Sequence, residues 1–206
     1  MEFLEIEIKY HLNDLKDMRK KIIELGAKSQ GRFIETNMRF DDQNNSLMKK
    51  KSLLRLRKDN KTTLTLKSRP PLEDDQFKIL EELEVEVTDF VTMNQILNDL
   101  GYEKKQVYEK FRETFLLDQA VICLDSMPYG DFLEIEAQKK EIKKIAAGLE
   151  LKWDRRIILN YLEIFDMIKA KLELTFTDMT FRNFEGINVN IQEFYHLFYA
   201  DHSNGK

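Results

Sequence analysis

The stretch LEIEIKY, residues 4–10, decides the fold of this chain. Its charged side chains, Glu5, Glu7 and Lys9, alternate with apolar ones. A period of two predicts a β-strand with one charged face and one apolar face. A second acidic strand of the same pattern, ELEVEV at residues 82–87, occurs later in the chain. The recurrence of this unusual strand suggests that the chain contains an internal repeat.

Each alternating strand is followed by an amphipathic helix of similar pattern. The first helix is expected to begin at Asn13 or Asp14 and the second at Asp89, with Gly26 and Gly101 ending them. Three strands should follow each helix, at 32–41, 53–58 and 62–68 in the first half and at 106–117, 120–125 and 131–137 in the second. Residues 1–138 are therefore predicted to hold two copies of a strand-helix-strand-strand-strand unit.

Eight mostly antiparallel strands are enough to close a barrel. The helices need apolar sheet surface to cover, so they are expected outside the barrel, with the charged strand faces inside. The predicted class is α+β, a closed eight-stranded antiparallel barrel. Further helices are expected at 139–151 and 156–171, which would complete one domain over residues 1–171. Residues 172–206 form an appendage, part helix and part extended, that would close one end of the barrel or build a dimer interface.

The amino-acid composition excludes several classes of protein. The chain has 206 residues, 33 of them basic and 37 acidic, and its hydrophobic share of 42% excludes a disordered chain. The net charge of −4 argues against binding nucleic acid through bulk basicity. The single cysteine, Cys123, excludes an intramolecular disulfide and a cysteine-based zinc site. Without a basic-then-apolar leader or a membrane-length apolar run, a cytoplasmic protein is expected.

The charges on the strands are grouped by sign. A sheet with one face in water is the ordinary explanation of any single alternating strand. Across the set, however, the charges are grouped by sign into three acidic strands and three basic ones, whereas a solvated face usually mixes the two. Clustered carboxylates favour Mg²⁺ or Mn²⁺, and clustered Arg and Lys favour phosphate. The ligand that satisfies both groups is a polyphosphate with its divalent metal. The acidic positions are Glu5, Glu7, Glu82, Glu84, Glu86, Glu134 and Glu136, and the basic ones are Lys9, Arg55, Arg57, Lys67, Lys110 and Arg112.

These segments resemble a known family in order and spacing. The Glu5-x-Glu7-x-Lys9 pattern is similar to the ExExK signature of the triphosphate tunnel metalloenzymes, the CYTH superfamily. Later segments resemble further family motifs: LRLR at 54–57, LTLK at 64–67, ELEVE at 82–86, KFR at 110–112, LD at 124–125, GDFLEIE at 130–136 and NYLE at 160–163.

The resemblance implies a tunnel that binds a triphosphate and one or two Mg²⁺ or Mn²⁺ ions. It implies that Glu5, Glu7 and Lys9 form the catalytic set and that catalysis needs no nucleophilic side chain. The implied metal ligands are Glu5, Glu7, Glu134 and Glu136, with Glu84 and Glu86 as further candidates. The implied phosphate-binding residues are Lys9, Arg55, Arg57, Lys67, Lys110 and Arg112.

The chain is most similar to class IV adenylate cyclase-type members, which convert ATP to cyclic AMP and pyrophosphate. The alternative is a triphosphatase acting on inorganic tripolyphosphate or on a nucleoside or thiamine triphosphate. A non-catalytic polyphosphate-binding module is the third possibility. The expected partner is a small triphosphate rather than nucleic acid or a membrane, and a homodimer is compatible with the appendage.

Overall fold

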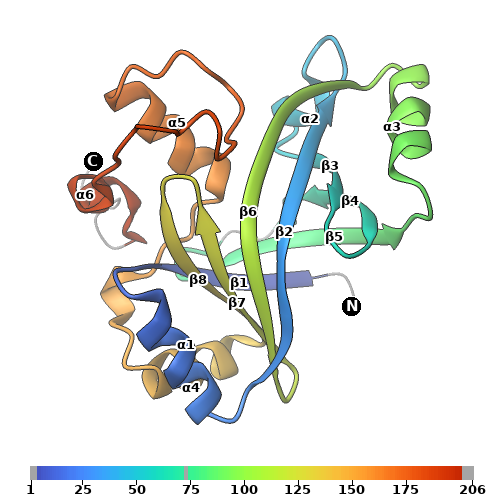
Figure 1. The fold of residues 1–206 in the computed structure, drawn as a ribbon. Coiled ribbons are helices and arrows are strands. Elements are labelled where there is room, and N and C mark those ends of the chain that lie inside the picture. Colours follow the sequence, from blue (N-terminus) through green and yellow to red (C-terminus); the bar gives the residue numbers. More distant parts are fainter. Residues whose placement is uncertain (1–3, 72–73, 201–206) are drawn as a thin grey trace.

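The computed structural model describes residues 4–71 and 74–200 of the chain. Within them, eight strands close into a barrel in the order β1-β5-β4-β3-β2-β6-β7-β8, and every neighbouring pair is antiparallel (Figure 1). The predicted α+β class and closed eight-stranded barrel are confirmed. The strands are β1 Leu4–Leu12, β2 Lys28–Asp41, β3 Leu53–Lys58, β4 Thr62–Ser68, β5 Lys78–Glu86, β6 Glu103–Leu117, β7 Ala120–Met127 and β8 Gly130–Glu136.

The helices complete the repeat that the sequence predicts. The order strand, helix, strand, strand, strand occurs twice, once from β1 to β4 and once from β5 to β8, with the short α2 as an addition to the first copy. The helices are α1 Leu15–Glu24, α2 Ser46–Lys49, α3 Phe90–Asp99, α4 Lys139–Gly148, α5 Tyr161–Lys171 and α6 Tyr195–Phe198, with 3₁₀ turns η1 Trp153–Arg155 and η2 Ile191–Phe194.

The first helices of the two copies begin and end alike. The side chain of Asp14 accepts a hydrogen bond from the Asp17 N–H, and the side chain of Asp89 accepts one from the Thr92 N–H. After each helix a glycine takes a positive φ, +97° at Gly26 and +86° at Gly101. The short sequence signals therefore fix both helix boundaries.

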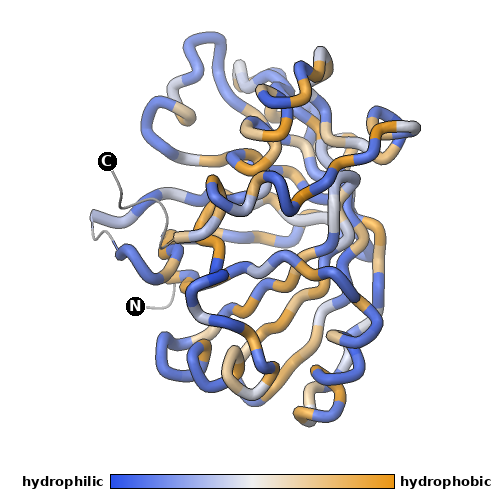
Figure 2. Tube along the Cα trace, turned by 90° about the vertical axis from the view of Figure 1, so that its left-hand side faces the viewer, coloured by the Kyte–Doolittle hydropathy of each residue, from blue (hydrophilic) through white to orange (hydrophobic). Residues whose placement is uncertain are grey.

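The helices cover the outside of the barrel. α1 and α4 pack on the apolar faces of β1, β7 and β8, through residues such as Ile22 and Ile142 against Ile8 and Ile135. α3 packs over β2 and β3, with Leu97 against Phe40 and Leu56. Figure 2 shows hydrophilic and hydrophobic residues alternating along the strands. Most of the outer apolar side chains of β1, β7 and β8 pack under helices, whereas Leu83 and Val85 of β5 are exposed, and the opposite strand faces point into the barrel.

The predicted helix at 156–171 begins later, at Tyr161. Asn160 caps it, because its side chain accepts hydrogen bonds from the N–H groups at the helix start and Glu163 completes a capping box. The residues before the cap are extended, since Ile157 exchanges backbone hydrogen bonds with Lys9 of β1. The helix predicted at 139–151 is also shorter and ends at Gly148.

The C-terminal segment packs against the barrel. Met179 forms a parallel bridge to Tyr108 of β6, and the Ala200 N–H donates to the Arg156 carbonyl. Its buried side chains share a second hydrophobic core with α5 and with the β7–β8 turn. The last part of the predicted appendage, residues 201–206, lies outside the described residues. None of the helices in the described part of the chain is long and apolar enough to cross a membrane.

Candidate active site

The barrel encloses a cavity of about 1400 Å³ that is lined by side chains from all eight strands. The lining residues follow a period of two along β1, β3, β6, β7 and β8, whereas consecutive residues also line the cavity in β2 and β5. Of the charged positions singled out from the sequence, only Glu86 does not line the cavity. Glu86 is exposed and pairs with Lys61 at 3.7 Å. The strand register therefore gathers the predicted acidic and basic faces into one interior space.

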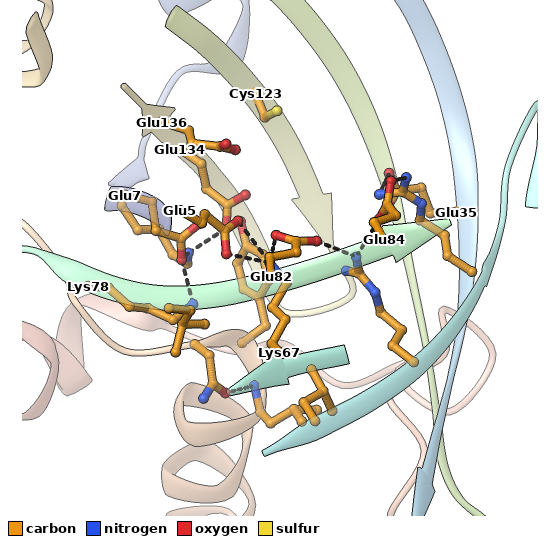
Figure 3. Close-up of a pocket in the computed structure, with 18 of the residues that line it drawn as sticks. Glu5, Glu7, Glu35, Lys67, Lys78, Glu82, Glu84, Cys123, Glu134 and Glu136 are labelled. Atoms are coloured by element: carbon orange, nitrogen blue, oxygen red, sulfur yellow. Dashed lines mark hydrogen bonds and ion pairs between the residues drawn. The ribbon is translucent and has the colours of Figure 1, made fainter. Parts of the chain in front are cut away.

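One side of the cavity is crowded with carboxylates. Glu7 of β1 lies directly opposite Glu136 of β8, and Glu5, Glu82 and Glu134 lie near them (Figure 3). Burial raises the pKa of Glu136 to about 7, and the negative charges of Glu5 and Glu7 add to this effect. The pKa of Glu5 is raised for the same reasons, burial first and Glu7 second. A cation is needed to bring these carboxylates together in ionised form.

Lysines supply part of that compensation. Lys67 donates to Glu5 at 2.6 Å and lies 2.9 Å from Glu82, and Lys78 donates to Glu7. Lys9 of β1 donates to Glu134 of β8.

Because Glu5, Glu7, Glu82 and Glu134 are each paired with an ammonium group, a divalent cation that bound them would compete with lysines. Within the described residues, no group of three His, Cys, Asp or Glu side chains is arranged around a single point that could hold a metal ion.

A second network lies on the β6–β7 side. Asp125 is fully buried and accepts hydrogen bonds from Arg112, from Lys110 at 3.1 Å and from the Tyr161 hydroxyl at 2.7 Å. Glu35 of β2 also faces these cations. Burial acts to raise the pKa of Glu35, but Lys110 and Arg112 outweigh it and lower the value to about 2. On this side of the cavity, the carboxylates of Asp125 and Glu35 therefore fix the positions of Lys110 and Arg112.

Two guanidinium groups form the wall between these networks. Arg55 donates to Thr65 at 3.2 Å and lies 3.6 Å from Glu84, and Arg57 donates to Glu84 at 3.5 Å. The Nε atom of Arg55 is buried without a hydrogen-bond partner among the described residues, whereas the Nε atom of Arg57 lies 3.4 Å from Oδ2 of Asp59. Across the β2–β3 pairing, Arg39 lies directly opposite Arg55. These positive groups retain hydrogen-bonding capacity for an anion.

The sequence interpretation assigned no role to several lining residues. Lys78 lies four residues before Glu82 on β5 and therefore points to the same side, into the cavity. The strand predicted from the sequence begins only at Glu82 and does not include Lys78. Glu35 and Arg39 share the inward parity of β2, a pattern that could have identified them. Asp125 and Tyr161 lie in segments matched to family motifs, but no local pattern shows that α5 brings Tyr161 against Asp125.

A closed barrel with these charged faces is also found by comparison. A model of the CYTH domain matches residues 4–169, which include all eight strands. The chain belongs to the CYTH family. Members are triphosphate tunnel enzymes that are generally metal-dependent, so the resemblance inferred from the sequence is confirmed at the level of the family.

Solved structures show how far the likeness to this CYTH protein extends. The PH1012 protein of Pyrococcus horikoshii OT3 is 30% identical, with a TM-score of 0.65 over 77% of this chain and 98% of that chain. The PH1819 protein of the same organism is 25% identical, with a TM-score of 0.65 over 80% and 99%. A candidate adenylate cyclase from Vibrio parahaemolyticus is 18% identical, with a TM-score of 0.71 over 81% and 99%, and supports the fold alone. No curated protein matches the chain.

Proposed function

We propose that this CYTH protein is a divalent-metal-dependent enzyme of the class IV adenylate cyclase type, which converts ATP to cyclic AMP and pyrophosphate. The observation that carries the proposal is the convergence of a carboxylate cluster and a set of buried cations in one cavity. Carboxylates suit a hard metal ion, and the cations suit the phosphate oxygens that accompany it. Neither half alone would select a metal-bound triphosphate.

The metal candidates fit the chemistry of such an ion. Glu5, Glu7, Glu134 and Glu136 are hard oxygen donors, and burial, together with the charges of Glu5 and Glu7, raises the pKa of Glu136, a penalty that a bound cation would relieve. Glu84 also lines the cavity, whereas exposed Glu86 does not support a ligand role. A bound Mg²⁺ or Mn²⁺ would supply charge neutralisation and orientation of the triphosphate.

The cations of the chain hold the phosphate chain in this proposal. Lys9, Lys110 and Arg112 lie on one side of the cavity, and Arg55, Arg57 and Lys67 lie on another. Each is fixed by at least one carboxylate, so little reorganisation is needed when negative charge develops on the phosphate oxygens. Binding and charge stabilisation are therefore done by the same groups.

The space around the charged centre favours a nucleoside triphosphate over a bare phosphate chain. The cavity is larger than a phosphate chain requires, and its lining also includes apolar side chains, among them Phe33, Val121, Ile158 and Leu162. Cyclisation aims the ribose 3′-hydroxyl at the α-phosphorus, whereas hydrolysis aims water at the terminal one.

The alternative is a triphosphatase acting on tripolyphosphate or on a nucleoside or thiamine triphosphate. The cationic side chains that line the cavity would bind the phosphate groups in either reaction. One neighbour of the same fold, a Hippeastrum adenylyl cyclase candidate, is described as having a dominant triphosphatase activity. The fold is therefore compatible with both outcomes. A non-catalytic module is the third, remote alternative.

Product analysis tests the proposal. The protein is incubated with ATP or tripolyphosphate and Mg²⁺ or Mn²⁺, and products are separated by ion-exchange chromatography. Cyclic AMP with pyrophosphate supports the cyclase. Orthophosphate without cyclic AMP replaces it with the triphosphatase. Binding without turnover of ATP, tripolyphosphate or thiamine triphosphate would leave only the polyphosphate-binding module.

A further inference from the structure

Tyr161, the first residue of α5, is delivered to the cavity by the segment that precedes the helix. The Lys9 N–H donates to the Ile157 carbonyl at 2.9 Å, and the Ile157 N–H returns a bond to the Lys9 carbonyl at 2.7 Å. The capping box at Asn160 then starts the helix immediately. The backbone hydrogen bonds between Lys9 and Ile157 and the capping box at Asn160 therefore fix where the Tyr161 side chain enters the barrel.

The ring of Tyr161 faces two ammonium groups. The Nζ atom of Lys9 lies 4.4 Å from the ring centroid, and the Nζ atom of Lys110 lies 5.2 Å from it. Both lysines are buried, with exposed fractions of 1% and 3%. A tyrosine face attracts a cation by about 0.5–2 kcal/mol, more as the site loses water. The ring therefore lowers the cost of keeping two buried like charges close together.

The hydroxyl of Tyr161 reaches Asp125, the carboxylate that pairs with Lys110. It donates to Oδ2 of Asp125 at 2.7 Å, and Asp125 also accepts from Lys110 and Arg112. One side chain thus contacts two proposed phosphate-binding lysines through its ring, and through its hydroxyl the counter-ion of Lys110 and Arg112. No other aromatic ring in the described part of the chain faces two of the proposed phosphate-binding cations.

The opposite side of Tyr161 belongs to the second hydrophobic core. Phe132 packs edge-on against its ring at a centroid distance of 5.3 Å, and the Tyr129 hydroxyl donates to its carbonyl at 3.0 Å. That core is completed by the C-terminal segment through residues such as Met179 and Phe198. The ring of Tyr161 is therefore packed against β8 and the β7–β8 turn, in a core that the C-terminal segment shares.

We propose that Tyr161 is a positioning residue for the triphosphate. Its ring face holds Lys9 and Lys110 at the phosphate site and connects them to the second hydrophobic core. This inference rests on the proposed function, because it treats both lysines as phosphate-binding groups. It also links the site to a hydrophobic core that the C-terminal segment shares, although none of the described residues of that segment lines the cavity.

A series of fluorinated phenylalanines at position 161 isolates the ring face. Each added fluorine withdraws electron density from the ring while changing its volume little. The dissociation constant of tripolyphosphate, measured by calorimetry in EDTA, should rise stepwise from phenylalanine to the trifluoro residue, about tenfold overall. The melting temperature without ligand should fall in the same order, because the ring face stabilises the two buried ammonium groups in the unliganded protein as well. A role in packing alone predicts no such trend.

Position 132 provides the matched control. Phe132 touches Tyr161 in the same core, but no cation lies over its ring in the described residues, so its fluorinated series should be flat. A second pair of variants needs no unnatural residue. Tyr161→Leu should weaken tripolyphosphate binding about tenfold, whereas Tyr129→Phe, which removes only a bond to the Tyr161 carbonyl, should change it less than twofold.

The outcomes separate this inference from the proposed function. A wild-type protein that binds tripolyphosphate but shows a flat series at position 161, or equal trends at 161 and 132, overturns the inference alone. A wild-type protein that binds no tripolyphosphate overturns both. Binding with the expected trend but without turnover of any triphosphate sinks the enzymatic proposal and leaves the positioning role intact.

Discussion

The ammonium group of Lys78 on β5 donates a hydrogen bond of 2.5 Å to Oε1 of Glu7 on the adjacent strand β1. Burial acts to raise the pKa of Glu7, but Lys78, with help from Lys9, outweighs it and lowers the value to about 2. The pair keeps a proposed metal ligand ionised inside the barrel. A metal ion bound by Glu7 would therefore compete with this lysine.

Replacing Lys78 with glutamine should expose that competition. Lys78→Gln leaves Glu7 as a buried charge that has lost its nearest partner, so the free energy of unfolding should fall by about 3–5 kcal/mol in EDTA. Mn²⁺ should then raise the melting temperature more in the variant than in the wild type. Lys21→Gln, which breaks an exposed pair with Glu150, is the control and should change neither measurement. An equal Mn²⁺ response in Lys78→Gln and wild type would contradict the competition.

Glu7→Gln should abolish turnover while the barrel stays folded. The amide keeps the size of the side chain but loses the charge that a divalent metal needs, so we expect the rate to fall at least about 100-fold. The measurement is product release from ATP or tripolyphosphate with Mn²⁺, together with circular dichroism. Glu86→Gln, exposed on β5, should keep full activity. Unimpaired turnover in Glu7→Gln would remove Glu7 from the site.

Asp125→Asn should destabilise the protein in a way that a polyanion reverses. The change leaves the buried Lys110 and Arg112 without their shared carboxylate, which is expected to cost about 3–5 kcal/mol of unfolding free energy. Tripolyphosphate should raise the melting temperature of the variant more than that of the wild type, since it replaces the missing negative charge. Asp118→Asn, in an exposed turn, should behave as wild type. A smaller tripolyphosphate shift in Asp125→Asn would argue against this role.

His11 should contribute to acid sensitivity. Burial lowers its pKa from 6.5 to about 4, with Asp131 acting in the opposite direction. Between pH 6.5 and 4 the unfolded chain binds a proton that the folded protein does not, so stability falls as the pH falls through this window. His11→Gln should therefore lose less stability than wild type between pH 6.5 and 4, measured by urea unfolding. The exposed His196→Gln should follow wild type, and parallel curves for all three proteins would count against the shift.

The C-terminal core should be essential for stability. Phe198 is buried with 1% exposure and stacks on Phe194, so Phe198→Ala should lower the unfolding free energy by about 3–5 kcal/mol. The neighbouring Leu197 is 43% exposed, and Leu197→Ala should have a much smaller effect. Urea unfolding of both variants is the measurement. Equal losses of stability in the two variants would contradict the assignment of Phe198 to the buried face of α6 and of Leu197 to the exposed face.

Most of the barrel was predictable because strand faces are a local property. The period of two in β1, β3 and β5 placed the charged and apolar side chains on opposite faces without any knowledge of distant contacts. Helix starts at Asp14 and Asp89 were equally local, since a cap needs only the next few residues. Extending the same parity to β2 would also have identified Glu35 and Arg39.

Other features depended on contacts between distant segments. The sequence by itself determined which residues share a strand face, and therefore which charges gather when the sheet closes. Only the tertiary structure decided that Glu86 reaches solvent, that Lys78 meets Glu7, and that Tyr161 lies against Lys9. The physical reason is that periodicity fixes the direction of a side chain relative to its own strand. Register, barrel closure and the packing of α5 fix what that side chain meets.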